Sequence, residues 1–374
     1  MATDKGVNLL TPGETPYENA QFLLFLCAVI EAVDKYQDLL RLSVATAGND
    51  HRLGANEAPP AVVSMFLGDE LTAVLDAVES DQPYSAAEKT LMRLGVHVLP
   101  KFPRDTTDRN RTSPFAFTGN KFEFRMLGSS ASIAGANIML NAAVAESLRL
   151  YADRLEGASD FAAELHDLLK ETIRAHRRII FNGNGYDDAW IREATEKRGL
   201  LNLRTTPDAL PTLLAKKNVE MLTRHKIFSL PELESRYEIT MENYCKTVHI
   251  EALTMVDMAR REILPAVAAY VRDLSDGLVA RKSAVPGASS AYETGLITRL
   301  SGLLDEMNAA TDALEGAVIR LKTVADVTEN AEMIRDTILQ KMAELRVVCD
   351  EAEAQTAEKY WPFPAYDKLL FGVR

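Results

Sequence analysis

The sequence contains little cysteine and no excess of positive charge. Three cysteines occur among 374 residues, Cys27, Cys245 and Cys349, far apart and without any Cys-x-x-Cys spacing. This pattern argues against a disulfide framework or a structural zinc site and favours a reducing compartment, with the cytoplasm as the default. The formal net charge of -12 argues against a general affinity for nucleic acid or an anionic membrane. An anionic ligand would need a local cluster of arginines.

Long hydrophobic runs and metal-binding histidine pairs are also absent. The most apolar run, residues 22–30, is too short to span a bilayer and predicts a buried helix instead. None of the six histidines pairs with another at helical metal spacing, so His51 and His97 are interpreted as ordinary surface or core residues. The segment NGNGY, residues 182–186, lacks the Lys and Ser/Thr of a phosphate loop and is expected to end a helix.

Helical patterns dominate what is present. Thr15, Pro16 and Glu18 fit the N-cap, N1 and N3 positions of a capping box, which predicts a first helix that continues to about Gly48. Ser129 is expected to be the N-cap of another helix. The chain is long enough for two domains, or for one large domain with an extension.

The composition changes beyond about residue 210, where long helical stretches replace strand candidates. Apolar residues recur at a spacing of three to four between residues 296 and 324, and again from residue 334 to residue 349. We expect these two helices to form an antiparallel pair that packs on the rest of the chain or on another subunit. The aromatic tail, YWPFPAYDKLLF, is expected to dock on the protein.

The clearest strand signal is the stretch NRTSPFAFTGNKFEFR, residues 110–125. Aromatic residues alternate with polar ones on both sides of Thr-Gly-Asn, which predicts a β-hairpin. Successive side chains of a strand point to opposite faces, so Lys121, Glu123 and Arg125 would share one face. Taken alone, such a row of ions is more often a solvated salt-bridge ladder than an active site.

Two other segments carry charged residues near turn signals. Residues 51–60, HRLGANEAPP, are interpreted as a rigid loop that holds Arg52 and Glu57. The segment DRNR places Arg109 and Arg111 directly before the hairpin. By spacing alone, residues 51–60 are interpreted as a surface loop with two ordinary charges.

In this order, RLGANEAP, NRTSPFAF and NKFEFR resemble the C-terminal catalytic half of glutamine synthetase. The sequences of the hairpin stretch, NGNGY and the YWPFP tail are similar to those of the large type III branch of that family. The resemblance covers nearly the whole chain. It implies an ATP-dependent glutamate–ammonia ligase that forms glutamine through γ-glutamyl phosphate. Such a site collects several negative oxygens, so it needs Mg²⁺ or Mn²⁺ and nearby arginines.

The resemblance assigns roles to the hairpin face. Glu123 would be a metal ligand, because a carboxylate is a hard oxygen donor suited to Mg²⁺ or Mn²⁺. Arg125 would hold the substrate glutamate or the transferred phosphoryl group. Lys121 would lie near the nucleotide.

Three further roles come from the segments before the hairpin. Arg52 would pair with a carboxylate of glutamate, a bidentate task that suits arginine. Glu57 would close the site over the acyl phosphate and help to deprotonate ammonium. Arg111 would contact the phosphates of ATP.

The resemblance also implies an architecture. We expect an α+β fold, with residues 1–210 forming the C-terminal part of a glutamine synthetase catalytic domain, antiparallel strands with helices. Residues 211–374 would form a mainly helical extension. Family members form homo-oligomers of stacked rings, with active sites between neighbouring subunits.

The sequence departs from the family pattern in two places. About fifty residues, including DQPYSAAEKT, separate the EAP and NRT motifs, and PFAF stands where shorter members carry a second arginine. The Gly-Ser-Gly segment with its metal-binding histidine and the N-terminal β-grasp domain do not occur in the sequence, so Met1 is interpreted as an internal methionine. We therefore expect this chain to be inactive alone. The alternatives are a non-catalytic assembly or regulatory module and a γ-glutamyl-amine ligase.

Overall fold

The computed structural model describes residues 1–55, 58–82, 84, 91–92, 102–103 and 112–372, so Glu57, His97, Arg109 and Arg111 lie outside the described residues. The chain divides into two compact units, Met1–Tyr237 and Glu238–Arg374. This division falls later in the chain than the predicted boundary between residues 210 and 211, which stays a prediction. Each unit is described by itself below.

Unit 1 begins with a short 3₁₀ turn, η1 (Pro16–Glu18), and helix α1 (Ala20–Lys35). The predicted capping box at Thr15 is wrong, because the Thr15 side chain makes no capping hydrogen bond. Asn19 caps α1 instead: its side-chain oxygen accepts a hydrogen bond from the Phe22 amide at 3.0 Å. Asparagine is as good an N-cap as threonine, and the tight turn before it brings Asn19 to that position.

The first predicted helix is three helices in the structure, α1, α2 (Gln37–Leu42) and α3 (Ala47–Arg52). Helix α1 is buried along most of its length and packs against α5 (Ala134–Glu156) and α6 (Phe161–His176). Ser129 does not cap α5, which begins five residues later; Ser132 accepts a hydrogen bond from the Ala134 amide at 3.2 Å. The remaining helical elements of unit 1 are α4 (Asp69–Ser80), η2 (Arg177–Ile179), α7 (Asp188–Arg192), the π-helical turn η3 (Glu193–Lys197), α8 (Thr206–Ala209), η4 (Leu210–Leu214) and α9 (Lys216–Arg224).

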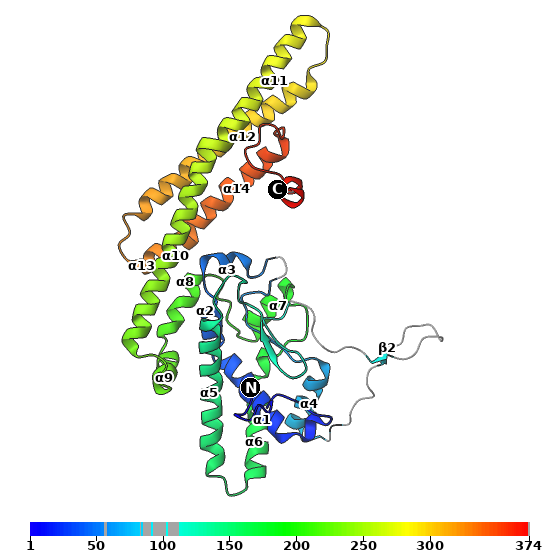
Figure 1. The fold of residues 1–374 in the computed structure, drawn as a ribbon, viewed down its shortest axis with the longest axis vertical. Helices are drawn as coiled ribbons and strands as arrows, with labels where there is room; N and C mark the ends of the chain where they lie inside the picture. The colour runs from blue at the N-terminus through cyan, green and yellow to red at the C-terminus, as the bar shows by residue number, and fades with distance from the viewer. Residues whose placement is uncertain (56–57, 83, 85–90, 93–101, 104–111, 373–374) are drawn as a thin grey trace. The chain divides into compact units, whose positions relative to one another are not determined.

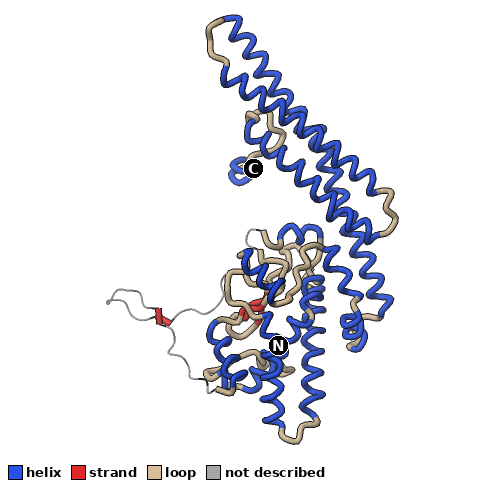
Figure 2. Tube along the Cα trace, turned by 180° about the vertical axis from the view of Figure 1, so that it is seen from behind, coloured by secondary structure: helices blue, strands red, loops and turns tan. Residues whose placement is uncertain are grey.

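A small mixed sheet lies in this unit (Figures 1 and 2). Its strands are β1 (Met65–Phe66), β4 (Phe115–Phe117) and β5 (Phe122–Phe124), in the order β1-β4-β5. Strands β4 and β5 form the predicted antiparallel hairpin, but β1 runs parallel to β4, so the expectation of only antiparallel strands is wrong. Parallel neighbours need a long crossover, which the segment between β1 and β4 supplies. Strands β2 (Leu91–Met92) and β3 (Phe102–Pro103) form a separate antiparallel pair.

The hairpin register places four phenylalanine rings on one face. Phe115 lies opposite Phe124, and Phe117 lies opposite Phe122. The centroid of the Phe122 ring is 5.1 Å from those of both Phe115 and Phe117, and Phe22 of α1 approaches Phe117 at 6.0 Å. The aromatic face is therefore part of the core of unit 1, as the alternation predicts.

Unit 2 is a bundle of long helices. Its first helix continues from α10 (Leu230–Met258), which begins in unit 1, through the π-helical turn η5 (Ala259–Ile263) into α11 (Leu264–Ala284). Pro265 has no amide hydrogen for the regular helical bond, and the wider π turn before it accommodates that loss. Helix α12 (Ala291–Leu321) then returns along α11 (Figure 1).

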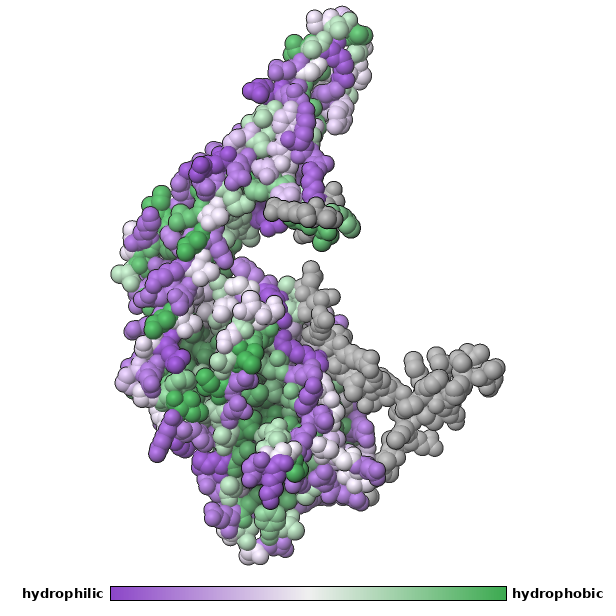
Figure 3. All heavy atoms as spheres, viewed as in Figure 1, coloured by the Kyte–Doolittle hydropathy of each residue, from purple (hydrophilic) through white to green (hydrophobic). Residues whose placement is uncertain are grey.

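Two helices of unit 2 cover the segments in which the antiparallel pair is predicted. Helix α12 packs against α14 (Leu339–Gln355), and α13 (Val327–Met333) and the π-helical turn η6 (Ile334–Ile338) lie between them in the sequence. The apolar positions that predicted the pair are all buried: Leu300, Leu303, Met307, Leu314, Val318, Leu321, Ile334, Ile338, Leu345 and Cys349. On the face drawn in Figure 3, the exposed hydrophobic side chains of unit 2 are scattered among hydrophilic ones.

The aromatic tail is only partly docked. The Tyr360 ring packs on Tyr270 with a centroid distance of 5.1 Å. The last helix, α15 (Tyr366–Phe371), exposes Leu369, Leu370 and Phe371, whose exposed fractions are 63%, 73% and 80%, so the prediction is wrong for this helix. Within the described ranges, no helix is both long and apolar enough to cross a membrane.

Candidate active site

The predicted row of ions exists on the face of β5 opposite the phenylalanines. Arg125 donates two hydrogen bonds to Oε2 of Glu123, from Nη2 at 3.1 Å and from Nε at 3.3 Å. The Lys121 ammonium lies 3.7 Å from Oε1 of the same carboxylate. The hairpin thus places one carboxylate between two cations, on a rigid strand backed by the aromatic core.

The turn of the hairpin completes the surroundings of Glu123. The Thr118 hydroxyl donates a hydrogen bond to Oε1 of Glu123 at 3.4 Å, and the Thr118 amide bonds to the Lys121 carbonyl at 2.9 Å. Gly119 has a φ of +95°, a backbone conformation that glycine adopts without strain. The Thr-Gly-Asn sequence therefore sets the turn and also directs a hydroxyl at the carboxylate.

The electrostatics of this group favour the charged form of Glu123. Burial raises the pKa of the Glu123 carboxyl, but the hydrogen bonds and charge of Arg125, the charge of Lys121 and the hydrogen bond from Thr118 together lower it below the ordinary value. The side chain of Glu123 is 40% exposed and that of Arg125 is 16% exposed. An accessible, ionised carboxylate is a suitable ligand for a hard divalent cation. No group of three or more potential metal-binding side chains occurs in the part of the chain that the structure describes.

Arg52 reaches the same place from a different element. It lies in the last turn of α3, not in the predicted loop. Its Nη1 donates hydrogen bonds to the Met126 carbonyl at 3.0 Å and to Oδ1 of Asn49 at 3.1 Å, and its Nη2 donates to the Arg125 carbonyl at 3.4 Å. The structure therefore places Arg52 against the backbone of Arg125, whose side chain is paired with Glu123, although Arg52 and Arg125 are 73 positions apart in the sequence.

A buried ion pair that sequence reasoning missed anchors the other side of α3. Arg41 and Asp50 have side chains that are 1% and 9% exposed, and Nη2 of Arg41 lies 2.7 Å from Oδ1 of Asp50. Arg41 also donates to the carbonyls of Leu203 and Arg204, and the second oxygen of Asp50 accepts from the Thr206 amide at 2.6 Å. No local sequence signal indicates this pair, because its partners come from distant parts of the chain.

The described residues constrain the ends of the two segments that carry Glu57 and Arg111. The Gly54 amide donates a hydrogen bond to the Pro59 carbonyl at 3.0 Å. Thr112, directly after Arg111, is buried. A Cβ atom on Gly185 would lie 2.3 Å from the carbonyl oxygen of Thr112, so only glycine fits there.

The segment NGNGY therefore has a different role from the predicted one. It does not end a helix but forms a loop between η2 and α7. The side-chain oxygen of Asn182 accepts hydrogen bonds from the amides of Leu67 and Gly68, at 3.1 and 3.0 Å, just after β1. The close approach of Gly185 to the backbone of Thr112 accounts for a glycine at this position.

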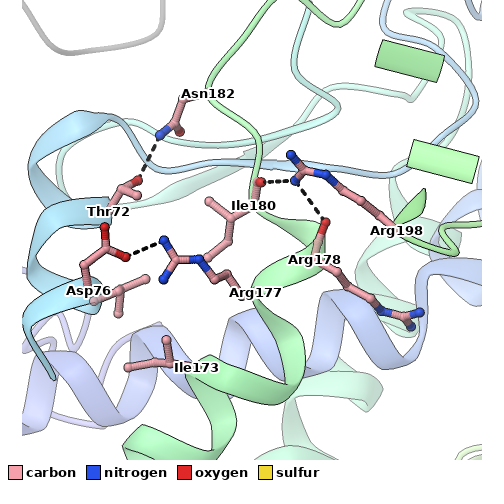
Figure 4. A pocket seen from close by; sticks show the side chains of 9 residues that line it. Thr72, Asp76, Ile173, Arg177, Arg178, Ile180, Asn182 and Arg198 are labelled. Atoms are coloured by element: carbon pink, nitrogen blue, oxygen red, sulfur yellow. Dashed lines mark hydrogen bonds and ion pairs between the residues drawn. The ribbon is translucent and has the colours of Figure 1, made fainter. Parts of the chain in front are cut away.

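A cavity of about 360 Å³ lies at the opposite edge of the sheet (Figure 4). Ile180, which lines it, bridges to Met65 of β1, and β4 lies between β1 and β5. Its arginines are already paired with carboxylates: Arg177 with Asp76 and Glu79, Arg178 with Asp34, and Arg198 with Glu193. The cavity therefore offers little net positive charge for an anion, and Arg52, Glu123 and Arg125 are not among the residues that line it.

Comparisons with known proteins agree with the motif geometry. The family model described as "Glutamine synthetase C-terminal domain" matches residues 164–282. The chain is 45% identical to a glutamine synthetase of Butyrivibrio fibrisolvens over 100% of its own length and 53% of the relative. It is 39% identical to a type-3 glutamine synthetase of Dictyostelium discoideum over 99% of its length and 51% of the relative. A glutamine synthetase of Bacteroides fragilis (strain YCH46) is also 39% identical, over 99% of the chain and 52% of the relative.

The chain therefore belongs to the glutamine synthetase family. Within the family it corresponds to a C-terminal portion of the type III branch, and it spans about half the length of the curated relatives that it matches.

Proposed function

We propose that this chain supplies the C-terminal part of the active site of an ATP-dependent glutamate–ammonia ligase. The observation that carries the proposal is the contact of Arg52, at the end of α3, with the backbone of Arg125 and Met126, where the side chain of Arg125 is paired with Glu123 of β5. A ligase that joins a carboxylate, ATP and ammonium must bind several anionic groups at close range. One ionised carboxylate held among arginines suits that task, and the full-length similarity to glutamine synthetases supports it.

Glu123 fits the role of one ligand to Mg²⁺ or Mn²⁺. Its carboxylate is ionised and accessible, and its position on a strand backed by the core fixes its direction. When bound, the cation would neutralise phosphate oxygens. One carboxylate is a poor cage for Mg²⁺, so the remaining ligands would be substrate oxygens, water and groups outside the described residues.

The two arginines fit the recognition of carboxylate or phosphoryl oxygens. Arg125 is mostly buried and held by Glu123, so its guanidinium is oriented before a substrate arrives. The hydrogen bonds of Arg52 use three of its five N–H groups, and no described residue accepts from the other two. Arg52 can therefore bind a carboxylate of glutamate without giving up its hydrogen bonds to the carbonyls of Arg125 and Met126.

The other assignments extend the same proposal. Lys121, which is 65% exposed beside Glu123, would contact the nucleotide. Arg111 would bind ATP phosphates, and Glu57 would close over the acyl phosphate and take a proton from ammonium. Both residues lie outside the described ranges.

The proposed architecture follows from the family. Residues 1–210 would be the C-terminal part of the catalytic domain and residues 211–374 the helical extension. The full-length protein would act as a cytoplasmic homo-oligomer of stacked rings, with glutamate, ammonium and ATP as substrates. We expect residues 1–374 alone to form no glutamine, because the relatives use about twice this length.

A joined protein tests the proposal. Residues 1–374 are fused to the part of the Butyrivibrio fibrisolvens relative that they do not match, and glutamine formation is measured with ATP, glutamate and ammonium. We expect activity that depends on Mg²⁺ or Mn²⁺, and a loss on the order of a hundred-fold in Glu123→Gln. Binding of Mn²⁺, followed by electron paramagnetic resonance, should weaken in the same variant.

Glu156→Gln is the matched control, because Glu156 is an exposed glutamate at the end of α5. A folded joined protein without activity, beside an active parent relative, would refute the proposal. Equal activity in the two variants would refute the role of Glu123. Activity with small amines but not with ammonium would support a γ-glutamyl-amine ligase instead.

A further inference from the structure

Asn49 lies at the centre of the contacts that bring Arg52 to the candidate site. It is 7% exposed and belongs to α3, one turn before Arg52. Its Nδ2 donates hydrogen bonds to the Val44 carbonyl at 2.8 Å and to the Met126 carbonyl at 2.9 Å. Its Oδ1 accepts the hydrogen bond from Nη1 of Arg52 at 3.1 Å. A single amide thus joins the start of α3, the end of β5 and the guanidinium.

The orientation of this amide is determined by its partners. Both Nδ2 hydrogens point to carbonyl oxygens, and Oδ1 receives a cationic donor. An amide turned by 180° would set an oxygen against two carbonyls and an NH₂ group against a guanidinium, which would break all three bonds. Asparagine therefore suits this position, because both N–H donors and the oxygen acceptor of its side-chain amide have partners.

The Met126 carbonyl links the two side chains directly. It accepts one hydrogen bond from Asn49 and one from Arg52, which uses both of its lone pairs. Arg52 also donates to the carbonyl of Arg125, the residue before Met126. Any shift of Arg52 away from Asn49 would therefore change its position relative to the backbone that carries Arg125.

We propose that Asn49 is a positioning residue, whose buried amide holds Arg52 in a fixed relation to Arg125 so that both arginines can bind one anionic substrate. Its effect on glutamate rests on the proposed function, whereas its effect on the Arg52 side chain does not. Without the Asn49 oxygen, one Nη1 hydrogen of Arg52 loses its acceptor and the guanidinium gains freedom to turn toward solvent. Substrate binding must then overcome the disorder of that side chain.

Asn49→Ala tests the proposal, with Asn218→Ala as a matched control. Asn218 is also a fully buried asparagine of unit 1, and its side chain donates to Oδ2 of Asp38 at 3.0 Å and to the Thr212 carbonyl at 2.7 Å. Both variants remove a buried amide that satisfies a backbone carbonyl, so a structural cost alone would affect them alike. Only Asn49 contacts Arg52.

The first readout is the reaction of Arg52 with phenylglyoxal in the 374-residue chain, followed by peptide mass analysis. We expect Asn49→Ala to raise the rate several-fold and Asn218→Ala to leave it unchanged. Asn49→Asp keeps an oxygen for Arg52 but loses both donors to the Val44 and Met126 carbonyls, so it should restore protection in part. Where Asn49→Ala does not fold by circular dichroism, Asn49→Ser is measured in its place.

The second readout is steady-state kinetics of the joined protein. We expect Asn49→Ala to raise the KM for glutamate on the order of ten-fold, with a smaller change in the KM for ATP. An unchanged Arg52 reaction rate in Asn49→Ala, or equal rates in both alanine variants, would overturn the proposal. A raised Arg52 rate in a joined protein that forms no glutamine would leave the positioning of Arg52 standing and refute the proposed function.

Discussion

Glu146 offers a sharp test of how charge stabilises unit 1. This glutamate of α5 is 4% exposed, and its carboxylate receives hydrogen bonds from three side chains. Arg149 of the same helix donates from Nε and Nη2, both at 3.0 Å. Arg224 and His225, at the C-terminal end of α9, contribute bonds of 2.5 and 2.7 Å. The cluster therefore ties α9 to α5 by a buried charge.

The size of the effect follows from the pKa. The hydrogen bonds from Arg149 lower the pKa of Glu146; burial raises it, but the His225 bond and the arginine charges lower it further, to about 2 from an ordinary 4.5. Such a pKa corresponds to about 3 kcal/mol of folding stability at neutral pH. Because Arg149 and Arg224 are 34% and 45% exposed, solvent screens part of this contribution. We therefore expect about 2 kcal/mol from the cluster.

The sign of the pH dependence is fixed by the direction of the shift. A carboxyl whose pKa is lower in the folded state stabilises the protein above its unfolded pKa. The contribution is fully present above about pH 5 and is lost as the pH falls from 4.5 toward 2. More than half of it should be gone at pH 3. Glu146→Gln should therefore cost about 2 kcal/mol at pH 7 and about 1 kcal/mol at pH 3.

The assay needs a signal from unit 1 alone. The chain has two tryptophans, and Trp361→Phe leaves Trp190, which is 3% exposed and stacked on Phe181. Urea unfolding followed by Trp190 fluorescence then gives the free energy of unfolding at pH 7 and pH 3. Glu171→Gln is the control, because its exposed carboxylate pairs with Arg154 at the surface and should contribute much less. Equal losses in the two variants, or a loss in Glu146→Gln that does not shrink at pH 3, would refute the reasoning.

Three further outcomes are expected. Burial raises the pKa of the Cys27 thiol to about 12, so iodoacetamide at pH 8 should leave Cys27 unmodified until the chain unfolds; rapid labelling of the native chain would contradict this. Gly185→Ala should lower thermal stability, because its Cβ would meet the Thr112 carbonyl at 2.3 Å, whereas Gly302→Ala in α12, which meets nothing within 4 Å, should raise it. Leu314→Ala, at a fully buried position of α12, should cost about 2–5 kcal/mol in urea unfolding of unit 2, followed through Trp361 in a Trp190→Phe background.

Local periodicity was sufficient to predict the hairpin and the helix pair of unit 2. The alternation from Phe115 to Arg125 indicates both faces of the strands, because successive side chains of a strand point to opposite faces of the sheet. The apolar spacing from Leu300 to Leu321 indicates the buried side of α12. In both cases the signal lies within the element that it predicts.

Features that depend on distant partners could not be predicted in this way. The parallel pairing of Met65 with Phe115 joins segments fifty residues apart, and the alternation of either strand contains no information on that partner. The role of Gly185 depends on Thr112, and the cap of α1 depends on how the turn before Asn19 folds. The family resemblance assigned a role to Arg52, but local patterns placed it in a loop because α3 is short and contains Gly48.

The shortness of α3 explains why the site needs buried polar groups. A helix of six residues is not stable in isolation, because the free-energy cost of nucleating it exceeds the stabilisation from so few hydrogen bonds. Apolar packing cannot replace that stability, since Ala47 is the only buried hydrophobic residue among Ala47–Arg52. The order of α3 must then come from the ion pair of Asp50 with Arg41 on one side and the amide of Asn49 on the other. Polar contacts are directional, so they fix the rotation of the helix as well as its position. Arg52 is thereby directed toward the segment after β5 by two neighbouring residues that each have one partner far away in the sequence, Met126 for Asn49 and Thr206 for Asp50.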